Sequence, residues 1–391
     1  MGRAFLIVMD SVGIGGAPDA GAFFNGDRPD TGANTLAHIA DAHPLAMPHL
    51  DRLGLGAAVK LASGRRAPGL GAAPEGLWGA ATEVSPGKDS PTGHWELAGV
   101  PLPWVWTTFP DRRPALPPDL SAAIARAAGT AGILGDCHAS GTEILARLGA
   151  EHLRTGWPIV YTSVDSVVQI AAHEQVFGLE RLHALCAAIA PRVHALRVGR
   201  VIARPFTGAP GAFARSPARR DWAIPPPAPT LLDVAAGAGR ATHAIGKIGD
   251  IFSHRGITHL HNGASDAELA HHLLRLGREA GEGSLTFANF VEFDSLWGHR
   301  RDVSGYARAL EWFDTVAGAL MARLRPGDLA IFTADHGNDP TWPGTDHTRE
   351  RVPVLGWGAG SRAVGQVGFV DIGASVAAHL GLRLAKGPPF L

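Results

Sequence analysis

The chain has 391 residues, and its 35 Lys and Arg against 36 Asp and Glu give a formal net charge of −1. This length allows two domains or one large domain with an insertion, and a hydrophobic content of 46% argues against a disordered chain. The balanced charge provides neither the basic field of a nucleic-acid-binding protein nor a polybasic patch for an anionic membrane.

The first apolar run, residues 5–9, is too short for the core of a signal peptide or for a membrane span. Two cysteines, Cys137 and Cys186, cannot build a disulfide framework and are typical of a reducing compartment. We therefore expect a soluble, cytoplasmic protein, and nothing in the sequence indicates a protein partner.

Three apolar, β-rich runs are followed by acidic residues, and helical patterns at 266–279 and 303–324 lie between them. The runs are 5–9, 286–291 and 329–333, and they lead to Asp10, Asp294 and Asp335 respectively. Continuous apolar runs flanked by helices indicate buried strands of a parallel sheet. Open α/β sheets place functional groups at the carboxyl ends of their strands, so we expect the two ends of the chain to form one active face.

The middle of the chain has a different composition. It begins with a segment rich in Pro, Trp and Arg at about 103–116 and ends at the stiff Pro-rich connector 225–229. We predict a separate α/β module over 104–224, inserted into a domain made of 1–103 and 225–391. Its expected elements are helices at 121–128 and 180–187 and strands at 158–162 and 195–203.

Carboxylate and imidazole side chains gather at the predicted strand ends. Three carboxylates and three imidazoles divide into two sets of three, which suits a two-metal centre for phosphoryl transfer. Oxygen and nitrogen donors without thiolate favour Mn²⁺ or Zn²⁺. The six candidate ligands are Asp10, Asp294, His299, Asp335, His336 and His347.

The nucleophile is expected in the segment 87–96, which contains hydroxyls, a lysine and a histidine. Asp89, Ser90 and Pro91 have the pattern of a capped helix start, where main-chain N–H groups favour a phosphate. A dinucleotide-binding loop at Gly13 is unlikely by its pattern, because the third glycine of that motif is replaced by Pro18. No Gly-x-Ser-x-Gly elbow is present, which disfavours a serine hydrolase.

These motifs together resemble the phosphopentomutases of the alkaline phosphatase superfamily. The resemblance is carried by ten blocks that span nearly the whole chain: 5–19, 32–36, 87–96, 161–167, 170–174, 203–206, 246–251, 293–302, 333–339 and 343–350. It implies an α/β fold with an alkaline-phosphatase-like core, a mostly parallel sheet and the smaller inserted module as a cap.

The resemblance also implies roles for individual residues. Asp10, Asp335 and His336 would hold one Mn²⁺, and Asp294, His299 and His347 the other, although other divalent metals are possible. The residues implied to contact the sugar or its remote phosphate are Asp165, Arg200, Arg215 and Lys247. The family usually has Thr where this chain has Ser90, and Thr92 leaves a second candidate for the nucleophilic hydroxyl.

The reaction implied is the interconversion of ribose or 2-deoxyribose 1-phosphate with the 5-phosphate through a phosphorylated Ser90, with a sugar bisphosphate as activator. A metal-dependent phosphatase or phosphodiesterase of the same superfamily would use the same residues and remains the alternative. A cofactor-independent phosphoglycerate mutase is disfavoured because its nucleophile motif is missing. A non-catalytic sugar-phosphate-binding module is disfavoured because all six metal ligands are present.

Overall fold

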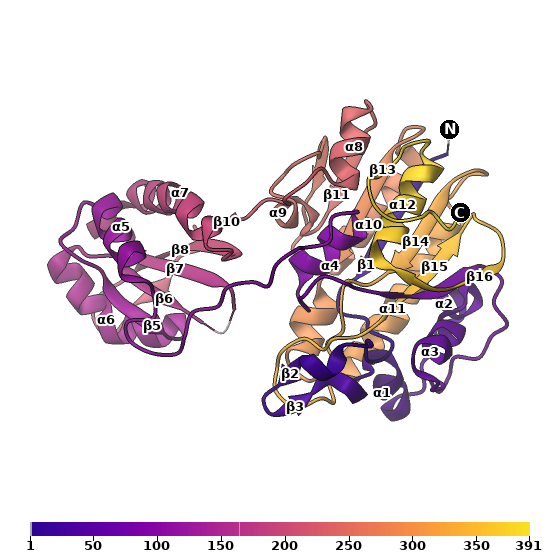
Figure 1. The fold of residues 1–391 in the computed structure, drawn as a ribbon, viewed down its shortest axis with the longest axis horizontal. Helices are drawn as coiled ribbons and strands as arrows, with labels where there is room; N and C mark the ends of the chain where they lie inside the picture. Colours follow the sequence, from indigo (N-terminus) through magenta and orange to yellow (C-terminus); the bar gives the residue numbers. More distant parts are fainter. Residues whose placement is uncertain (1, 164) are drawn as a thin grey trace. The chain divides into compact units, whose positions relative to one another are not determined.

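The computed structural model describes residues 2–163 and 165–391 (Figure 1). The chain forms two compact units, one of residues 1–103 and 225–391 and the other of residues 104–224. Both are mixed α/β structures, in agreement with the predicted fold class. Among the described residues, no helix combines the length and the apolar character needed to cross a membrane.

The larger unit is built on an eight-stranded sheet in the order β12-β11-β13-β1-β14-β15-β4-β16. The run from β12 to β14 is parallel, whereas β15 is antiparallel to both of its neighbours, so the sheet is mostly parallel. The strands are β1 (Ala4–Met9), β4 (Leu77–Thr82), β11 (Thr242–Ile245), β12 (His259–His261), β13 (Leu285–Phe290), β14 (Leu329–Thr333), β15 (Val352–Trp357) and β16 (Arg362–Gly368).

Helices cover both faces of this sheet (Figure 1). Alternate residues of β13 show the two layers: Phe287 contacts Phe252 on one side, and Phe290 contacts Phe313 on the other. The first layer contains α4 (Ser90–Leu97), α8 (Leu231–Gly237), α9 (Ile248–Ile251) and α12 (Phe369–His379). The second contains α1 (Thr35–Ala42), α2 (Pro48–Leu53), α3 (Leu55–Ser63), α10 (Asp266–Glu279) and α11 (Val303–Met321).

Short elements complete the larger unit. They are a ribbon of β2 (Phe24–Asn25) and β3 (Arg28–Pro29), the 3₁₀ turns η1 (Ala20–Ala22) and η2 (Asp30–Gly32), and the π-helical turn η4 (Phe293–Gly298). The predicted strands at 5–9, 286–291 and 329–333 and the helices at 266–279 and 303–324 are confirmed to within a few residues.

The smaller unit has a second sheet in the order β10-β8-β7-β6-β5, with β9 paired to β8. Two apolar clusters cover its two faces, one formed with α5 and α7 and the other with α6. Its elements are α5 (Pro118–Ala128), β5 (Leu134–His138), α6 (Gly141–Thr155), β6 (Ile159–Thr162), β7 (Val167–His173), η3 (Glu174–Gly178), α7 (Leu179–Ala195), β8 (Arg200–Thr207), β9 (Ala214–Arg215) and β10 (Arg220–Ala223).

One boundary in this unit is corrected. The predicted strand at 195–203 begins only at Arg200, because α7 continues to Ala195 and the chain then turns at Arg197, whose φ is 62°. The alanine-rich segment before residue 195 keeps a helical apolar face that packs on the sheet, and this contact decides its conformation.

Candidate active site

Three neighbouring parallel strands place the acidic residues at one edge of the large sheet. β1 lies between β13 and β14 in parallel register, so the carboxyl ends of the three strands are adjacent. Asp10 directly follows β1, Asp335 lies shortly after β14, and Asp294 lies in η4, which follows β13. The parallel arrangement therefore brings together carboxylates that are more than 300 residues apart in the sequence.

The first ligand group consists of Asp10, Asp335 and His336, all buried, with one ligand atom of each within 4.8 Å of the others. Nε2 of His336 lies 3.6 Å from Oδ1 of Asp10 and 3.3 Å from Oδ2 of Asp335. Within the described part of the chain, these two carboxylate oxygens accept no hydrogen bond although they are buried. Buried carboxylate oxygens without donors are what a bound cation would satisfy, so these residues fit a metal ion.

The second group is formed around Asp294. Asp294, His336 and His347 offer ligand atoms within 4.8 Å of one another. Nε2 of His299 lies 3.0 Å from Oδ2 of Asp294 and 3.1 Å from Nε2 of His347. The six predicted ligands therefore lie together, and His336 is close to both groups, which the sequence did not predict.

Main-chain carbonyl groups orient the three imidazoles. Nδ1 of His299 donates to Thr345 O at 2.6 Å, Nδ1 of His336 to Gly337 O at 3.1 Å, and Nδ1 of His347 to Lys88 O at 2.8 Å. In a neutral imidazole a hydrogen on Nδ1 leaves the lone pair on Nε2, the atom that faces the carboxylates in each case. Such contacts fix the tautomer of a metal-binding histidine. Without a cation, Asp294 raises the pKa of His299 and, despite burial, raises that of His347 to about 10, so a bound cation would replace a proton on each of these two rings.

The electrostatics of the cluster also suit a cation. Burial and the neighbouring carboxylates Asp335 and Asp294 raise the pKa of Asp10 well above its ordinary value. Burial lowers the pKa of His336 to about 4, so this imidazole is neutral at pH 7 and able to donate its Nε2 lone pair. Crowded carboxylates around a neutral imidazole form a site whose charge a divalent ion would offset.

Ser90 begins α4, as the sequence predicted, with Asp89 as the N-cap. Oγ of Ser90 lies 3.4 Å from Nε2 of His336, at the ligand cluster. Thr92 has a different environment: its hydroxyl is buried, donates to Asp89 O at 2.8 Å and belongs to the capping box. Gly93 allows α4 to approach so closely, because a Cβ at that position would lie 2.2 Å from Asp335 O.

The four predicted substrate residues are divided between the two units: Lys247 lies in the larger unit, and Asp165, Arg200 and Arg215 lie in the smaller one. Lys247 is exposed after β11, and its charge lowers the pKa of Asp10. In the smaller unit, Asp165 is exposed just before β7, and Arg200 pairs with Val167 at the start of β8. Arg215 pairs with Phe206 at the opposite end of β8. Asp165 and Arg200 are therefore at one end of the smaller sheet. The guanidinium of Arg215, whose main chain pairs further along β8, lies against Gly141 at the start of α6 and the hydroxyl of Tyr161.

Two asparagines at the ligand cluster were missed by the sequence analysis. Nδ2 of Asn289 donates to Oδ2 of Asp10 at 2.8 Å, and Nδ2 of Asn338 donates to Oδ1 of Asp294 at 2.7 Å. Asn289 interrupts the apolar strand 285–290, and a polar amide in a buried strand is a signal that it has a specific partner.

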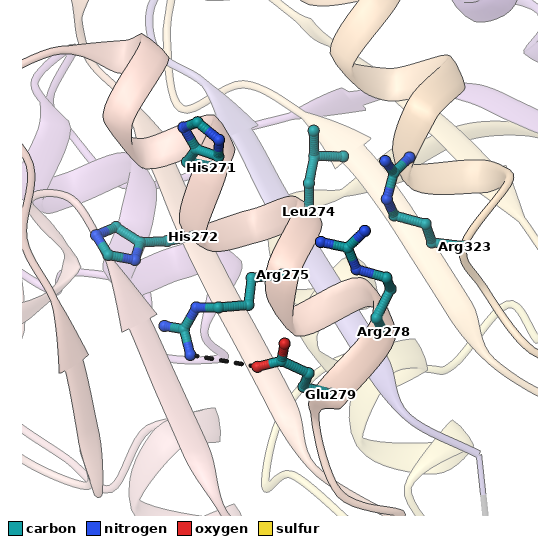
Figure 2. Close-up of a pocket in the computed structure, with 7 residues that line it drawn as sticks. All are labelled: His271, His272, Leu274, Arg275, Arg278, Glu279 and Arg323. Atoms are coloured by element: carbon teal, nitrogen blue, oxygen red, sulfur yellow. Dashed lines mark ion pairs between the residues drawn. The ribbon is translucent and has the colours of Figure 1, made fainter.

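The candidate ligands do not lie in the cavity shown in Figure 2. A cavity of about 410 Å³ lies along α10 and is lined mainly by basic and histidine side chains, including His272, Arg278 and Arg323 (Figure 2). Arg275 and Glu279 form an ion pair at 3.5 Å beside it. None of the candidate ligands lines this cavity, so the convergence of side chains, rather than a hollow, identifies the site.

The chain is similar to known proteins both in sequence and in fold. A model of the metalloenzyme superfamily matches residues 233–384. A phosphopentomutase from Sinorhizobium medicae is 56% identical over 98% of both chains, and one from Methylobacterium is 54% identical over the full length of both. A solved structure of a Pyrococcus horikoshii protein has a TM-score of 0.50 over 98% of this chain and 99% of its own, at 13% identity, which concerns the fold alone.

Proposed function

The chain belongs to the phosphopentomutase family, and from this premise we propose that a phosphorylated Ser90 exchanges its phosphoryl group with the 1- and 5-hydroxyls of a pentose. The enzyme is an isomerase that acts on pentose phosphates, which are small molecules. We propose further that Ser90 carries the phosphoryl group and that the residues around it bind the metal ions and the substrate.

The observation that carries the proposal is the position of the Ser90 hydroxyl. Its Oγ is 3.4 Å from Nε2 of His336, the histidine close to both ligand groups. Thr92, the other candidate, uses its hydroxyl in the capping box of α4. Of these two hydroxyls, Ser90 is therefore the one at the ligand cluster.

We propose two divalent ions as cofactors, one held by Asp10, Asp335 and His336 and the other by Asp294, His299 and His347. Carboxylate and imidazole donors support Mn²⁺ as the ion, although they also accept other divalent metals. When bound, such ions offset the charge of the phosphoryl oxygens and lower the pKa of an attacking alcohol.

The protein residues then have the following roles. Ser90 gives its phosphoryl group to a free sugar hydroxyl: the bond from phosphorus to Oγ breaks, a bond from phosphorus to the sugar oxygen forms, and the proton of the sugar hydroxyl passes to Oγ, which becomes a hydroxyl again. The product is a pentose 1,5-bisphosphate. The hydroxyl of Ser90 then takes the phosphoryl group from the other end of the sugar, and the α4 N-terminus stabilises the negative oxygens. A sugar bisphosphate would phosphorylate an enzyme that has lost its phosphate.

We assign the remaining predicted residues to the sugar. Arg200, Arg215 and Lys247 are suited to the remote phosphate, since a guanidinium binds phosphate through two parallel hydrogen bonds. Asp165 is suited to accept hydrogen bonds from sugar hydroxyls. We assign the inserted unit 104–224 the role of a cap that excludes water and so prevents hydrolysis of the phosphoserine. The unpaired cysteines Cys137 and Cys186 support a cytoplasmic location.

Mapping of the phosphorylated residue tests this proposal. After incubation with a sugar bisphosphate, peptide mass spectrometry should find phosphate on Ser90. Ser90→Ala should lose the label and at least about 10³-fold in kcat, because no other hydroxyl replaces it. Ser90→Thr should keep measurable turnover, since threonine also has a hydroxyl group on Cβ.

Two results would contradict the assignment. They are phosphate on Thr92 and mutase turnover that survives in Ser90→Ala. Release of inorganic phosphate in excess of isomerisation would instead indicate that hydrolysis is the main reaction.

A further inference from the structure

We propose that His94 and Asn289 form a buried positioning pair that holds Ser90 in register with the ligand carboxylates of Asp10 and Asp335. The pair lies directly behind the site, in α4 and β13 respectively, and neither residue was predicted to have a role. The inference rests on the proposed function, in which Ser90 carries the phosphoryl group and Asp10 and Asp335 hold a metal ion.

The amide of Asn289 links Asp10 to His94. Its Nδ2 lies 2.8 Å from Oδ2 of Asp10 and 3.1 Å from Nε2 of His94. The reverse orientation of the amide would place its oxygen against the Asp10 carboxylate, which is repulsive once a cation keeps that carboxylate ionised. Nδ2 therefore donates one hydrogen to Asp10 and its second hydrogen to His94. The orientation in the structure leaves Oδ1 of Asn289 buried without a donor among the described residues.

This contact determines the tautomer of His94. Because Nε2 of His94 accepts a hydrogen bond from Asn289, the hydrogen of the imidazole lies on Nδ1. Nδ1 is 2.8 Å from the main-chain oxygen of Ser90 and donates to it. The same Nδ1 also lies 3.1 Å from Oδ2 of Asp335, so His94 contacts a ligand carboxylate as well as the main chain of Ser90.

Packing leaves the pair little freedom to move. The side chains of His94 and Asn289 are completely buried. The imidazole is stacked on Phe287 of β13, with ring centroids 5.9 Å apart and planes inclined by 26°. Gly93 brings this turn of α4 against the main chain of Asp335. One connected set of contacts thus extends from the main chain of Ser90 through His94 and Asn289 to Asp10.

His94 has two separable effects, one on the position of Ser90 and one on the orientation of the Asn289 amide. The donor at Nδ1 holds the first turn of α4, and a displacement of the Ser90 oxygen by about 1 Å is enough to cost about 10²-fold in rate. The acceptor at Nε2 keeps the Asn289 amide oriented toward Asp10. Loss of an outer contact of this kind typically costs about 10- to 100-fold in metal affinity or activity.

Three substitutions at position 94 separate these effects. His94→Asn keeps a donor near the position of Nδ1, and His94→Gln keeps an acceptor near the position of Nε2. His94→Phe removes both polar contacts but retains a ring to stack on Phe287. His243→Gln is the matched control, because His243 is a buried histidine of the same sheet. It pairs with Thr286 near the amino end of β13, whereas the ligand groups follow the carboxyl ends of the strands.

Two measurements are made on each variant. Binding of Mn²⁺ to the substrate-free enzyme is followed by the EPR signal of the free ion, and kcat and KM are measured with ribose 5-phosphate. We expect His94→Asn to weaken Mn²⁺ binding about tenfold with a smaller loss in kcat. We expect His94→Gln to lose about 10²-fold in kcat with Mn²⁺ binding closer to that of the parent. KM should change by less than about threefold in both, because neither contact reaches the sugar.

His94→Phe should show both losses, and His243→Gln should show neither. The inference is overturned if His94→Phe keeps the parent kcat and Mn²⁺ affinity. It is also overturned if the Asn and Gln variants lose both properties equally, in proportion to their loss of thermal stability. If His94→Phe does not fold, the inference is still tested by comparing Mn²⁺ binding and kcat between His94→Asn and His94→Gln.

A different result would contradict the proposed role of Ser90. Phosphate mapped to Thr92 in the parent enzyme would remove Ser90 as the carrier. The Mn²⁺ measurements need no phosphoserine and would still test the connection from His94 through Asn289 to Asp10.

Discussion

At the residue scale, two hydroxyl groups near the start of α4 have distinct tasks. Ser90 presents Oγ to His336, whereas Thr92 both accepts from the main-chain N–H of Asp89 and donates to its carbonyl oxygen. Successive helical residues are rotated by about 100°, so side chains two positions apart face different directions. One hydroxyl is therefore free for chemistry, and the other stabilises the helix that carries it.

The substitution Thr92→Val tests this division. It removes the capping contact and should lower the free energy of unfolding by about 1 kcal/mol, the usual value of an N-terminal cap. The phosphate label on Ser90 should remain. Urea unfolding measures the loss of stability, and phosphopeptide mapping measures the label. Ser90→Ala should show the reverse, with loss of the label and little change in the free energy of unfolding. A Thr92→Val enzyme that is stable but cannot be phosphorylated would contradict this assignment.

At the scale of elements, each strand of the parallel series contributes differently. β13, β1 and β14 lead to the carboxylates, whereas the edge pair β11 and β12 carries a cluster of histidines. Nδ1 of His243 lies 3.2 Å from Nε2 of His261, and the ring of His243 is stacked on that of His259 with centroids 4.6 Å apart. Burial, together with the nearby charges of His259, His261 and Arg275, lowers the pKa of His243 to about 4.

This shift predicts a dependence of stability on pH. Between its ordinary pKa of 6.5 and about 4, His243 takes up a proton in the unfolded chain but not in the folded protein. The free energy of unfolding should therefore decrease as the pH falls through this range. Urea titrations at several pH values should give a shallower decrease for His243→Gln than for the parent. Equal slopes in the two proteins would show that His243 is protonated in the folded state.

On the scale of the whole molecule, the ligand cluster draws on segments from Asp10 to His347, all within the larger unit. The strands that lead to these ligands are mostly apolar, and every residue of β1, β13 and β14 is buried. Burial of this kind, rather than metal binding, is expected to supply most of the stability of a domain of this size.

Removal of metal should therefore abolish activity without unfolding the protein. A chelated sample should lose mutase turnover, keep its far-ultraviolet circular dichroism and melt at a lower temperature, since a ligand of the native state stabilises it. Activity should return on addition of Mn²⁺. Elemental analysis supplies the control, and full turnover in a sample shown to be free of metal would refute the metal assignment.

The positions of the two arginines of the smaller unit lead to a further prediction. Arg200 pairs with Asp221, which also pairs with Arg219. The hydroxyl of Tyr161 lies close to the charges of Arg204, Arg215 and Arg219. Arg200→Ala and Arg215→Ala should each reduce kcat/KM for pentose phosphates, and their effects should not simply add, because residues that share one group of charges are coupled.

Slow hydrolysis of a small aryl phosphate serves as the control for both arginine variants. Such an ester has no second group for these residues to bind, so its rate should change less. Equal losses on both substrates would mean that the arginines act on folding or at the ligand cluster.

Local patterns in the sequence were sufficient for the main features of the fold and the candidate site. Apolar runs followed by acids predicted β1, β13 and β14, and the order Asp89, Ser90, Pro91 predicted the start of α4. Both signals are local, because a buried strand must be apolar and a helix N-terminus must be capped.

Long-range contacts decided the rest. Only the assembled sheet brings His336 close to both ligand groups and directs Asn289 and His94 to Asp10 and Ser90. Strands β15 and β16, which extend the sheet beyond its parallel part, and the end of α7 were not predicted either. The physical reason is that strand pairing, helix ends and side-chain partners depend on packing between segments distant in the sequence, whereas apolar periodicity and capping depend on neighbours in the chain.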